Sequence, residues 1–273
     1  MPLLRKIAHG LTMMAMMAMM AMMAMMAMMA IILDFGNTFH KAAIFDGEEL
    51  VLLERYDRLN LRKLKELLAE FPLVQDGIAS SVVHYPAGIK NFLQNHLRLF
   101  IELTHRTPLP IISKYSSPKT LGRDRIACAV AASRLFKDVP ALVINAGTCI
   151  TYDLVTAHSE YLGGAISPGL QMRLKAMHTF TRKLPLLDLP DPGNITGSDT
   201  CESMISGAVH GTVAEVTGMI GNYRKAYPDL QVILSGGDME YLDKLLKIRI
   251  FALPNIVMVG LNYILEYNLQ HAK

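Results

Sequence analysis

The stretch that decides the fold is Ile31-Ile32-Leu33-Asp34-Phe35-Gly36-Asn37-Thr38. An apolar run ends in a carboxylate, the chain turns at a glycine, and a second extended run follows from His40 to Phe45 before the hairpin signal Asp46-Gly47. This pattern predicts a strand, a turn, a strand, a second turn and a third strand. In P-loop and dinucleotide-binding sequences the glycines open a helix instead, so neither of those folds is supported.

The first turn has the chemistry of a phosphate-binding loop. Gly36 carries no Cβ, so backbone N–H groups can approach a phosphate closely. Asp34 supplies a carboxylate of the kind that holds a magnesium ion and its waters. Taken alone, however, the same residue types are typical of any tight turn, and that simpler interpretation would be preferred if the pattern occurred only once.

A second copy of the pattern changes this balance. The run Ala141-Leu142-Val143-Ile144-Asn145-Ala146-Gly147-Thr148 is again an apolar strand that ends in a polar residue, a spacer, a glycine and a hydroxyl residue, and a β-rich run continues to Val155. Two such units more than a hundred residues apart predict a duplicated α/β fold, in which each half presents one phosphate turn across a cleft. This is the arrangement of the actin-like ATPases and the sugar kinases.

Length and charge exclude several other classes. The chain has 273 residues, and 27 Lys and Arg against 24 Asp and Glu give a formal net charge of +3. The length suits about two domains, while the charge is too weak and too scattered for a nucleic-acid surface. The cysteines Cys128, Cys149 and Cys201 are odd in number and widely spaced. They predict neither a zinc site nor a disulfide framework, and they fit a cytoplasmic protein.

Residues 1–30 form a low-complexity extension. From Met13 to Ala30 the chain repeats Met-Met-Ala, and residues 13–33 make an uncharged apolar stretch long enough to span a bilayer. A membrane anchor at residues 13–33 is therefore a minor alternative. Two observations weigh against it, because Leu33 and its neighbours are needed in the strand that leads to Asp34, and because the strict repeat matches neither an amphipathic helix nor a signal-peptide cleavage site. We expect no membrane partner.

Beyond the first hairpin, helical and strand patterns alternate, which is typical of the α/β class. The duplication places one actin-like half at residues 31–137 and the other at residues 138–273. In the helix predicted at residues 200–227, Gly207, Gly211 and Gly218 recur at helical spacing. They predict close packing, within the chain in the simpler interpretation and against another subunit in the alternative. Further helices are predicted at residues 60–71, 86–97, 126–132, 168–177 and 256–269, and buried strands at residues 77–83 and 232–234.

A third group of polar residues opens the helix that follows Leu121. Gly122-Arg123-Asp124-Arg125 precedes a run of small and apolar residues from Ile126 to Ala132. Asp124 is well suited to capping this helix. Alternatively, a carboxylate beside cationic groups can hold an anionic substrate and stay ionised to accept a hydroxyl proton. Position alone leaves both interpretations open.

Four motifs in this order resemble those of the type III pantothenate kinases. They are Asp34-Phe35-Gly36-Asn37-Thr38, Gly122-Arg123-Asp124-Arg125, the run from Gly147 to Asp153, and Gly163-Gly164-Ala165-Ile166-Ser167-Pro168-Gly169. The resemblance extends from about residue 31 to the C-terminal end. It implies a homodimeric actin-like kinase that uses ATP and Mg²⁺ to phosphorylate the primary hydroxyl of pantothenate, giving 4'-phosphopantothenate in the first step of coenzyme A biosynthesis.

The resemblance also implies roles for individual residues. Asp124 would be the catalytic base, and the turn Ser235-Gly236-Gly237-Asp238 would lie near the nucleotide base. The residues implied to hold ATP phosphates and magnesium are Asp34, Gly36, Asn37, Thr38, Lys41, Gly147 and Thr148. Those implied to contact pantothenate are Tyr115, Gly122, Arg123, Asp124, Arg125 and Thr181.

Asn145 departs from the family pattern, which has Asp at this position. In the family that carboxylate is associated with a monovalent cation, K⁺ or NH₄⁺, so the metal residues implied here are Asp34 and Asn145. Because losing a supporting carboxylate commonly costs about 10–100-fold in metal affinity or activity, we expect Asn145 to weaken the dependence on that cation. The departure keeps a second class open, a weakly active or non-catalytic accessory-factor-like relative that binds nucleotide or a protein partner. Another sugar-type kinase is the next alternative among enzymes.

Overall fold

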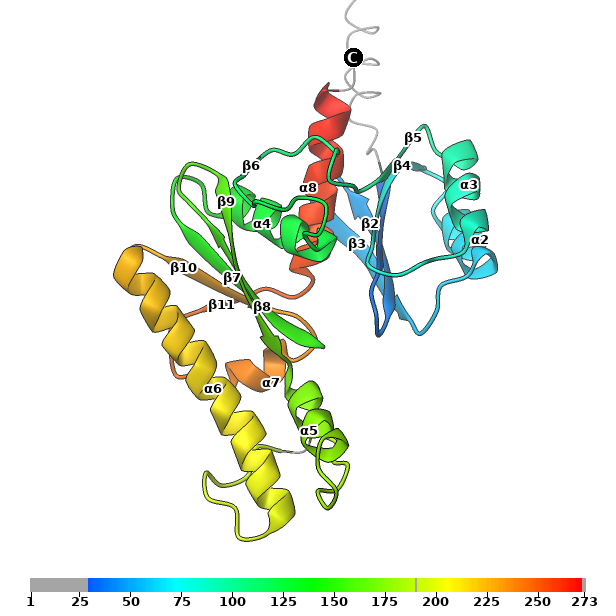
Figure 1. The fold of residues 1–273 in the computed structure, drawn as a ribbon. Helices are drawn as coiled ribbons and strands as arrows, with labels where there is room; N and C mark the ends of the chain where they lie inside the picture. Colours follow the sequence, from blue (N-terminus) through cyan, green and yellow to red (C-terminus); the bar gives the residue numbers. More distant parts are fainter. Residues whose placement is uncertain (1–28, 190, 272–273) are drawn as a thin grey trace, which may run out of the picture.

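The computed structural model describes residues 29–189 and 191–271. The Met-Met-Ala extension and the alternative of a membrane anchor at residues 13–33 lie outside these ranges, except for the last few residues, which belong to the first strand. Two β-sheets stand side by side, with helices between them and on both outer faces (Figure 1). None of the helices in the described ranges combines the length and the apolar character needed to cross a membrane.

The first sheet has five strands in the order β3-β2-β1-β4-β5. Strands β1 (Met29–Phe35), β2 (His40–Asp46) and β3 (Glu49–Tyr56) form antiparallel hairpins, and β4 (Val74–Ser81) and β5 (Leu99–Glu102) run parallel to β1. The predicted strand, turn, strand, turn and strand are therefore confirmed. Helices α2 (Leu61–Glu70) and α3 (Ala87–His96) follow the predicted ranges, and the Asn60 side chain caps α2 by accepting a hydrogen bond from the Lys63 N–H at 3.0 Å.

The second sheet repeats this order. Strands β7 (Ala141–Ala146), β8 (Cys149–Val155) and β9 (Glu160–Pro168) are antiparallel, and β10 (Gln231–Ser235) and β11 (Phe251–Ala252) run parallel to β7. The sheet order is β11-β10-β7-β8-β9-β6, so it matches the first sheet once the short β6 (Ile112–Ser113) is set aside. The predicted duplication is confirmed. The predicted boundary between residues 137 and 138 stays a prediction. Strand β6 comes before this boundary in the chain, although it pairs with β9 of the second sheet.

Five helices are associated with the second half and with the space between the sheets. Helices α4 (Arg123–Leu135) and α8 (Ile256–His271) lie between the two sheets (Figure 1). Helices α6 (Thr200–Ala226) and α7 (Met239–Asp243) cover the other face of the second sheet, and α5 (Leu170–Thr179) packs against α6. The molecule is therefore a stack of helix, sheet, helix, sheet and helix layers.

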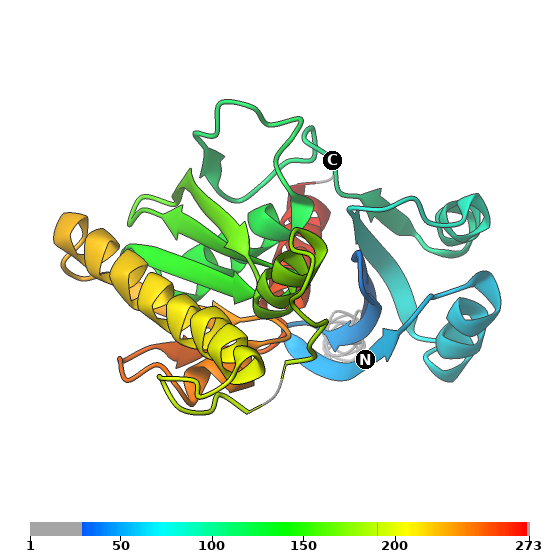
Figure 2. The ribbon, with the colours of Figure 1, turned by 60° about the horizontal axis from the view of Figure 1, so that its bottom comes forward.

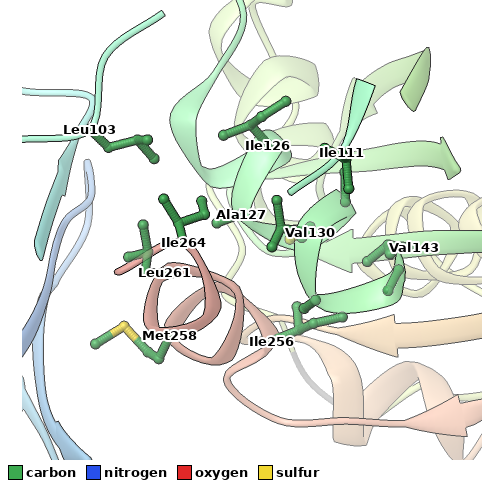
Figure 3. Close-up of a cluster of buried hydrophobic side chains, with 14 of the residues drawn as sticks. Leu103, Ile111, Ile126, Ala127, Val130, Val143, Ile256, Met258, Leu261 and Ile264 are labelled. Atoms are coloured by element: carbon green, nitrogen blue, oxygen red, sulfur yellow. The ribbon is translucent and has the colours of Figure 1, made fainter. Parts of the chain in front are cut away.

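The alternation of side chains along β1 explains this layering. Ile31 and Leu33 point towards α2 and α3, whereas Ile32 belongs to the central cluster around α4 and α8. Figure 3 shows the part of this cluster that α4 and α8 contribute, including Ile126 and Leu261. Within that cluster, Gly260 of α8 lies so close to α4 that a Cβ would overlap the carbonyl oxygen of Ala127. The absent side chain lets the two helix backbones approach, and the pair joins the two sheets.

The glycines of α6 pack against no other element in residues 29–189 and 191–271. Gly207, Gly211 and Gly218 are exposed, and a Cβ at any of them would meet no atom of a neighbouring element within 4 Å. Within the part of the chain that the structure describes, the intrachain interpretation therefore finds no support at these three residues. The helix runs along the outside of the second half (Figure 2).

Candidate active site

The first turn connects β1 to β2 and places Asp34 at the end of β1. In the sheet, Asp34 lies between Lys41 on β2 and Ser80 on β4. Burial, and after it the charge of Asp124, raise the pKa of Asp34 to about 6, while the charge of Lys41 acts in the opposite direction. A buried carboxylate with too little positive charge around it is suited to accept a cation. The turn residues Asn37 and Thr38 are exposed beside it.

The second turn connects β7 to β8 and is held from two sides. The N–H of Gly169, at the start of α5, donates to the Thr148 carbonyl at 3.1 Å, and a Cβ on Gly169 would overlap the Gly147 carbonyl oxygen. On the other side, the Asp238 N–H donates to the Ala146 carbonyl at 3.0 Å. The turn of residues 235–238, which was predicted to lie near the nucleotide base, is thus in contact with the strand that carries the second turn.

The two turns meet across the halves of the molecule. The hydroxyl oxygens of Thr38 and Thr148 lie 3.1 Å apart, although 110 residues separate them in the chain. Asn145 lies at the end of β7, between Thr151 of β8 and Ser235 of β10. The structure therefore brings together both predicted phosphate turns, and it leaves their hydroxyl-bearing residues accessible.

Asp124 lies in the first turn of α4, close enough to Asp34 for its charge to affect the pKa of that carboxyl. The helix is capped by Gly122 without a side-chain hydrogen bond, so Asp124 does not serve as the cap. Behind these groups is Cys128, whose thiol pKa is raised first by burial and then by the charges of Asp153, Asp124 and Asp34. Carboxylates from β1, α4 and β8 thus lie close enough to this thiol for their charges to act on it.

Arg125 points into the protein. Its Nε donates to Oδ1 of Asp153 at 2.8 Å, and the hydroxyl of Tyr161 donates to the same oxygen at 2.8 Å. Arg125 is 5% exposed and Asp153 is fully buried. Burial raises the pKa of Asp153, while Arg125 and the hydrogen bond from Tyr161 partly counteract it. Strand β8 therefore fixes the start of α4 through Arg125, whose predicted contact with substrate stays a prediction.

The remaining predicted substrate residues lie in three different environments. The Tyr115 ring lies 5.7 Å from the Arg125 guanidinium and stacks with Tyr161. Arg123 donates from Nε to the Leu103 carbonyl at 2.8 Å, and it lines a cavity of about 500 Å³ beside the carboxyl ends of β4 and β5, a usual place for ligands in α/β sheets. Thr181 is exposed beyond α5. Its hydrogen bonds within the described ranges are with Met177 and Leu184, so they do not link it to the other predicted site residues.

Sequence reasoning gave no role to Ser80 or Asp153. Asp153 is a carboxylate within the otherwise apolar and hydroxyl-rich strand β8, and a buried charge of this kind calls for a partner. The charge within this strand could therefore have predicted a buried ion pair, although the sequence does not identify Arg125 as the partner. Ser80 lies in a run of small residues, Ala79-Ser80-Ser81, which carried no such signal.

Comparison with known proteins identifies the family. The sequence model described as "Type III pantothenate kinase" matches residues 30–222. The chain belongs to the type III pantothenate kinase family. Relatives with this name include those of Phocaeicola vulgatus, 42% identical over 238 residues, and Christiangramia forsetii, 39% identical over 239 residues; each match covers 87% of this chain and 98% of the relative.

Solved structures agree on the fold of this type III pantothenate kinase family member. A conserved putative Baf family transcriptional activator from Campylobacter jejuni is 21% identical with a TM-score of 0.55, covering 88% of this chain and 99% of that one. The ROK hexokinase from Thermus thermophilus is 14% identical with a TM-score of 0.51, covering 89% and 100%. At these identities the likeness shows the fold alone, which is the predicted duplicated actin-like fold of the sugar kinases.

Membership of the type III pantothenate kinase family implies the use of ATP and a divalent metal ion. In residues 29–189 and 191–271, no group of three or more His, Cys, Asp and Glu residues is arranged to hold a metal ion. Mg²⁺ commonly binds through one or two carboxylates together with substrate phosphates. Asp34 fits this mode, because it is a partly buried carboxylate with a pKa of about 6, beside two turns whose exposed residues can receive the phosphates.

Proposed function

We propose that this protein uses ATP to phosphorylate the primary hydroxyl of pantothenate, which gives 4'-phosphopantothenate in the first step of coenzyme A biosynthesis. The observation that carries the proposal is that the turn after Asp34 meets the turn that contains Thr148, while Asp124 at the start of α4 lies close enough to Asp34 for its charge to act there. Family membership supplies the identity of the acceptor.

The chain's own residues divide the work between binding and proton transfer. The backbone N–H groups and hydroxyls of the two turns hold the phosphates, with Lys41 beside Asp34. A magnesium ion bound with ATP would neutralise phosphate charge, and Asp34 is the residue that would hold it. Asp124 accepts the proton of the acceptor hydroxyl, which is too weak an acid to ionise unaided. On the acceptor side, the family resemblance assigns pantothenate contacts to Gly122 and Arg123 at the start of α4 and to Tyr115, which lies beside Arg125.

An assay of ADP release with and without pantothenate tests this function. We expect ADP formation to depend on pantothenate, and Asp124→Asn to lower turnover by roughly 100- to 10,000-fold while ATP binding persists. Arg98→Gln is the control, since it breaks an ion pair with Asp76 near the opposite end of β4 from Ser80. Unchanged turnover in Asp124→Asn would remove this residue from the role of base.

The same assay separates the alternatives. Family membership favours the kinase over an accessory-factor-like protein, which would bind nucleotide without pantothenate-dependent ADP release. Another sugar-type kinase would reveal itself if a different alcohol outcompeted pantothenate as the acceptor.

The monovalent-cation site is the part of the family chemistry that Asn145 alters. Its amide is isosteric with a carboxylate and can offer one oxygen, but it carries no charge. Asn145 remains at the end of β7, three residues before Thr148, so it can still support the second turn. We infer that dependence on K⁺ or NH₄⁺ is weakened in this protein.

The protein is further proposed to be a homodimer that uses the outer side of α6. Gly207, Gly211 and Gly218 leave a strip of this long helix without side chains, and nothing else in the described chain covers it. Beside the helix, Ile195 is 77% exposed, and its carbonyl accepts a hydrogen bond from Ser206. Small residues allow two helix backbones to approach closely, and a second copy of α6 is the partner that symmetry favours.

Light scattering tests the dimer. We expect the wild-type protein to have twice the mass of one chain and Gly211→Leu to shift it to the monomer. Arg62→Leu, at an exposed position on α2, is the matched control for adding a leucine to a helix surface. A wild-type monomer, or a Gly211→Leu protein that remains dimeric, would place the interface elsewhere or remove it.

A further inference from the structure

The carboxylate of Glu215 lies at a junction of four elements. Glu215 belongs to α6, and its Oε1 accepts hydrogen bonds from the Tyr152 hydroxyl of β8 at 2.9 Å and from the Ser167 hydroxyl of β9 at 2.5 Å. Its Oε2 accepts from Nη2 of Arg173 on α5, with which it forms an ion pair. Both oxygens are therefore occupied by side chains, and none of these residues was assigned a role in catalysis or binding.

Each of these contacts favours the ionised form of Glu215. Burial alone would raise the pKa of this carboxyl, but the hydrogen bonds from Ser167, Arg173 and Tyr152 lower it below its usual value. Charge-assisted hydrogen bonds are roughly twice as strong as neutral ones. The junction is therefore a fixed point, at which α6 is tied to the end of β9 and the start of α5.

A continuous series of contacts leads from this junction to the second phosphate turn. Arg173 also donates from Nε to the Pro168 carbonyl at 2.9 Å, which fixes the end of β9. The next residue, Gly169, donates its N–H to the Thr148 carbonyl and packs against the Gly147 carbonyl without room for a Cβ. A displacement of Pro168 and Gly169 would therefore move the turn whose hydroxyl meets Thr38 across the halves.

We propose that Glu215 and Arg173 are positioning residues, which set the place of the Gly147-Thr148 turn and thereby the affinity for the phosphates of ATP. Neither residue touches a reacting atom in this scheme. The inference rests on the proposed function only in that the second turn binds nucleotide phosphates. Because α5 also ends just before Thr181, the same junction sets the direction of the helix that leads to this predicted substrate contact.

Nucleotide binding tests the inference directly. The dissociation constant of a fluorescent N-methylanthraniloyl ATP is measured with Mg²⁺ for the wild type, Glu215→Gln and Arg173→Gln. Supporting residues around a ligand site commonly contribute about 10–100-fold, so we expect each variant to bind the probe about tenfold more weakly. We expect the double variant to bind no more weakly than either single variant, because the two residues act as a pair. Ser167→Ala removes one hydrogen bond to the same carboxylate, and we expect it to show a smaller loss in the same direction.

Arg98→Gln is the matched control, because Arg98 also forms an ion pair through Nη2 but with Asp76 in the first sheet. A purely structural role for Glu215 predicts lower thermal stability in all these variants with the probe affinity within twofold of the wild type. That outcome would overturn the proposal, and so would an equal loss of affinity in Arg98→Gln. If the wild type binds the probe but does not phosphorylate pantothenate, the proposed function fails while this inference is still decided by the binding data. If Glu215→Gln does not fold, Ser167→Ala and Arg173→Gln decide it.

Discussion

Replacing Asp34 with Asn should make the nucleotide-free protein more stable and inactive at the same time. The pKa of Asp34 is raised from its usual 3.8 to about 6, first because the carboxyl is buried and then because Asp124 is close by. At neutral pH the folded protein therefore carries a charge that its surroundings disfavour. Each pKa unit corresponds to about 1.4 kcal/mol, so this rise destabilises the folded protein by roughly 3 kcal/mol when Asp34 is ionised.

The direction with pH follows from the two pKa values. Above about pH 6, Asp34 is ionised in both the folded and the unfolded chain, so the folded state carries the full cost of the buried charge. Below about pH 4 the residue is protonated in both states and the cost disappears. The stability contributed by this residue therefore rises as the pH falls from about 6 to 4, whereas Asn at this position has no such dependence.

Urea unfolding of the nucleotide-free wild type and Asp34→Asn at pH 8 and pH 4 measures this difference. We expect the variant to be more stable by roughly 3 kcal/mol at pH 8 and by less than about 1 kcal/mol at pH 4. In an Asp124→Asn background the gain should shrink, because one cause of the raised pKa is removed. Two results would refute the reasoning that the ionised Asp34 carboxylate destabilises the protein until a cation binds. One is a variant that is less stable than the wild type at pH 8, and the other is a stability difference that does not change with pH.

Three further predictions concern other parts of the molecule. Asn145→Asp should raise turnover or restore dependence on K⁺, measured by ADP release with and without the cation; no change in either would show that the position tolerates both residues. Gly260→Ala should lower the free energy of unfolding in urea by about 1–3 kcal/mol, because its Cβ would overlap the Ala127 carbonyl oxygen, and an unchanged midpoint would contradict this close contact. Asp153→Asn should cost about 3–5 kcal/mol in the same measurement, because Arg125 would be left buried without its charged partner; a loss under about 1 kcal/mol would mean that water or another group compensates.

The parts of the fold that could be predicted from sequence are those encoded by contiguous residues. The runs that end in Asp34 and Asn145 each contain a strand, its turn and the next strand, so the duplication was visible without any knowledge of long-range contacts. Helix α2 could also be predicted from sequence, since its apolar face and its cap at Asn60 lie within a dozen residues. Strand β4 was predicted to begin too late, at residue 77 instead of Val74, because Asp76 looks like a surface residue until it is seen paired with Arg98.

The parts that could not be predicted depend on pairs that are distant in the chain. Nothing near Arg125 identifies Asp153 as its partner, and nothing near Thr38 identifies Thr148. The spacing of the α6 glycines predicted close packing, but the sequence does not show that this side of the helix faces away from the other described elements. The neighbouring sequence allowed Asp124 to be the N-cap of α4. Only the backbone conformation of the folded protein shows that Gly122 is the N-cap residue.

The position of α8 has a consequence for the order in which this protein folds during synthesis. Residues 256–271 pack against α4 and against β1 and β4, so the inner face of the first sheet is covered in part by a helix that is made only after the second sheet. In a nascent chain that has completed the first sheet, Ile32, Ala43 and Ile78 therefore lack their full cover until both α4 and α8 have left the ribosome. We expect chains arrested before residue 256 to be caught by proteases or to aggregate, and release of α8 to be the event that commits the molecule to its native core.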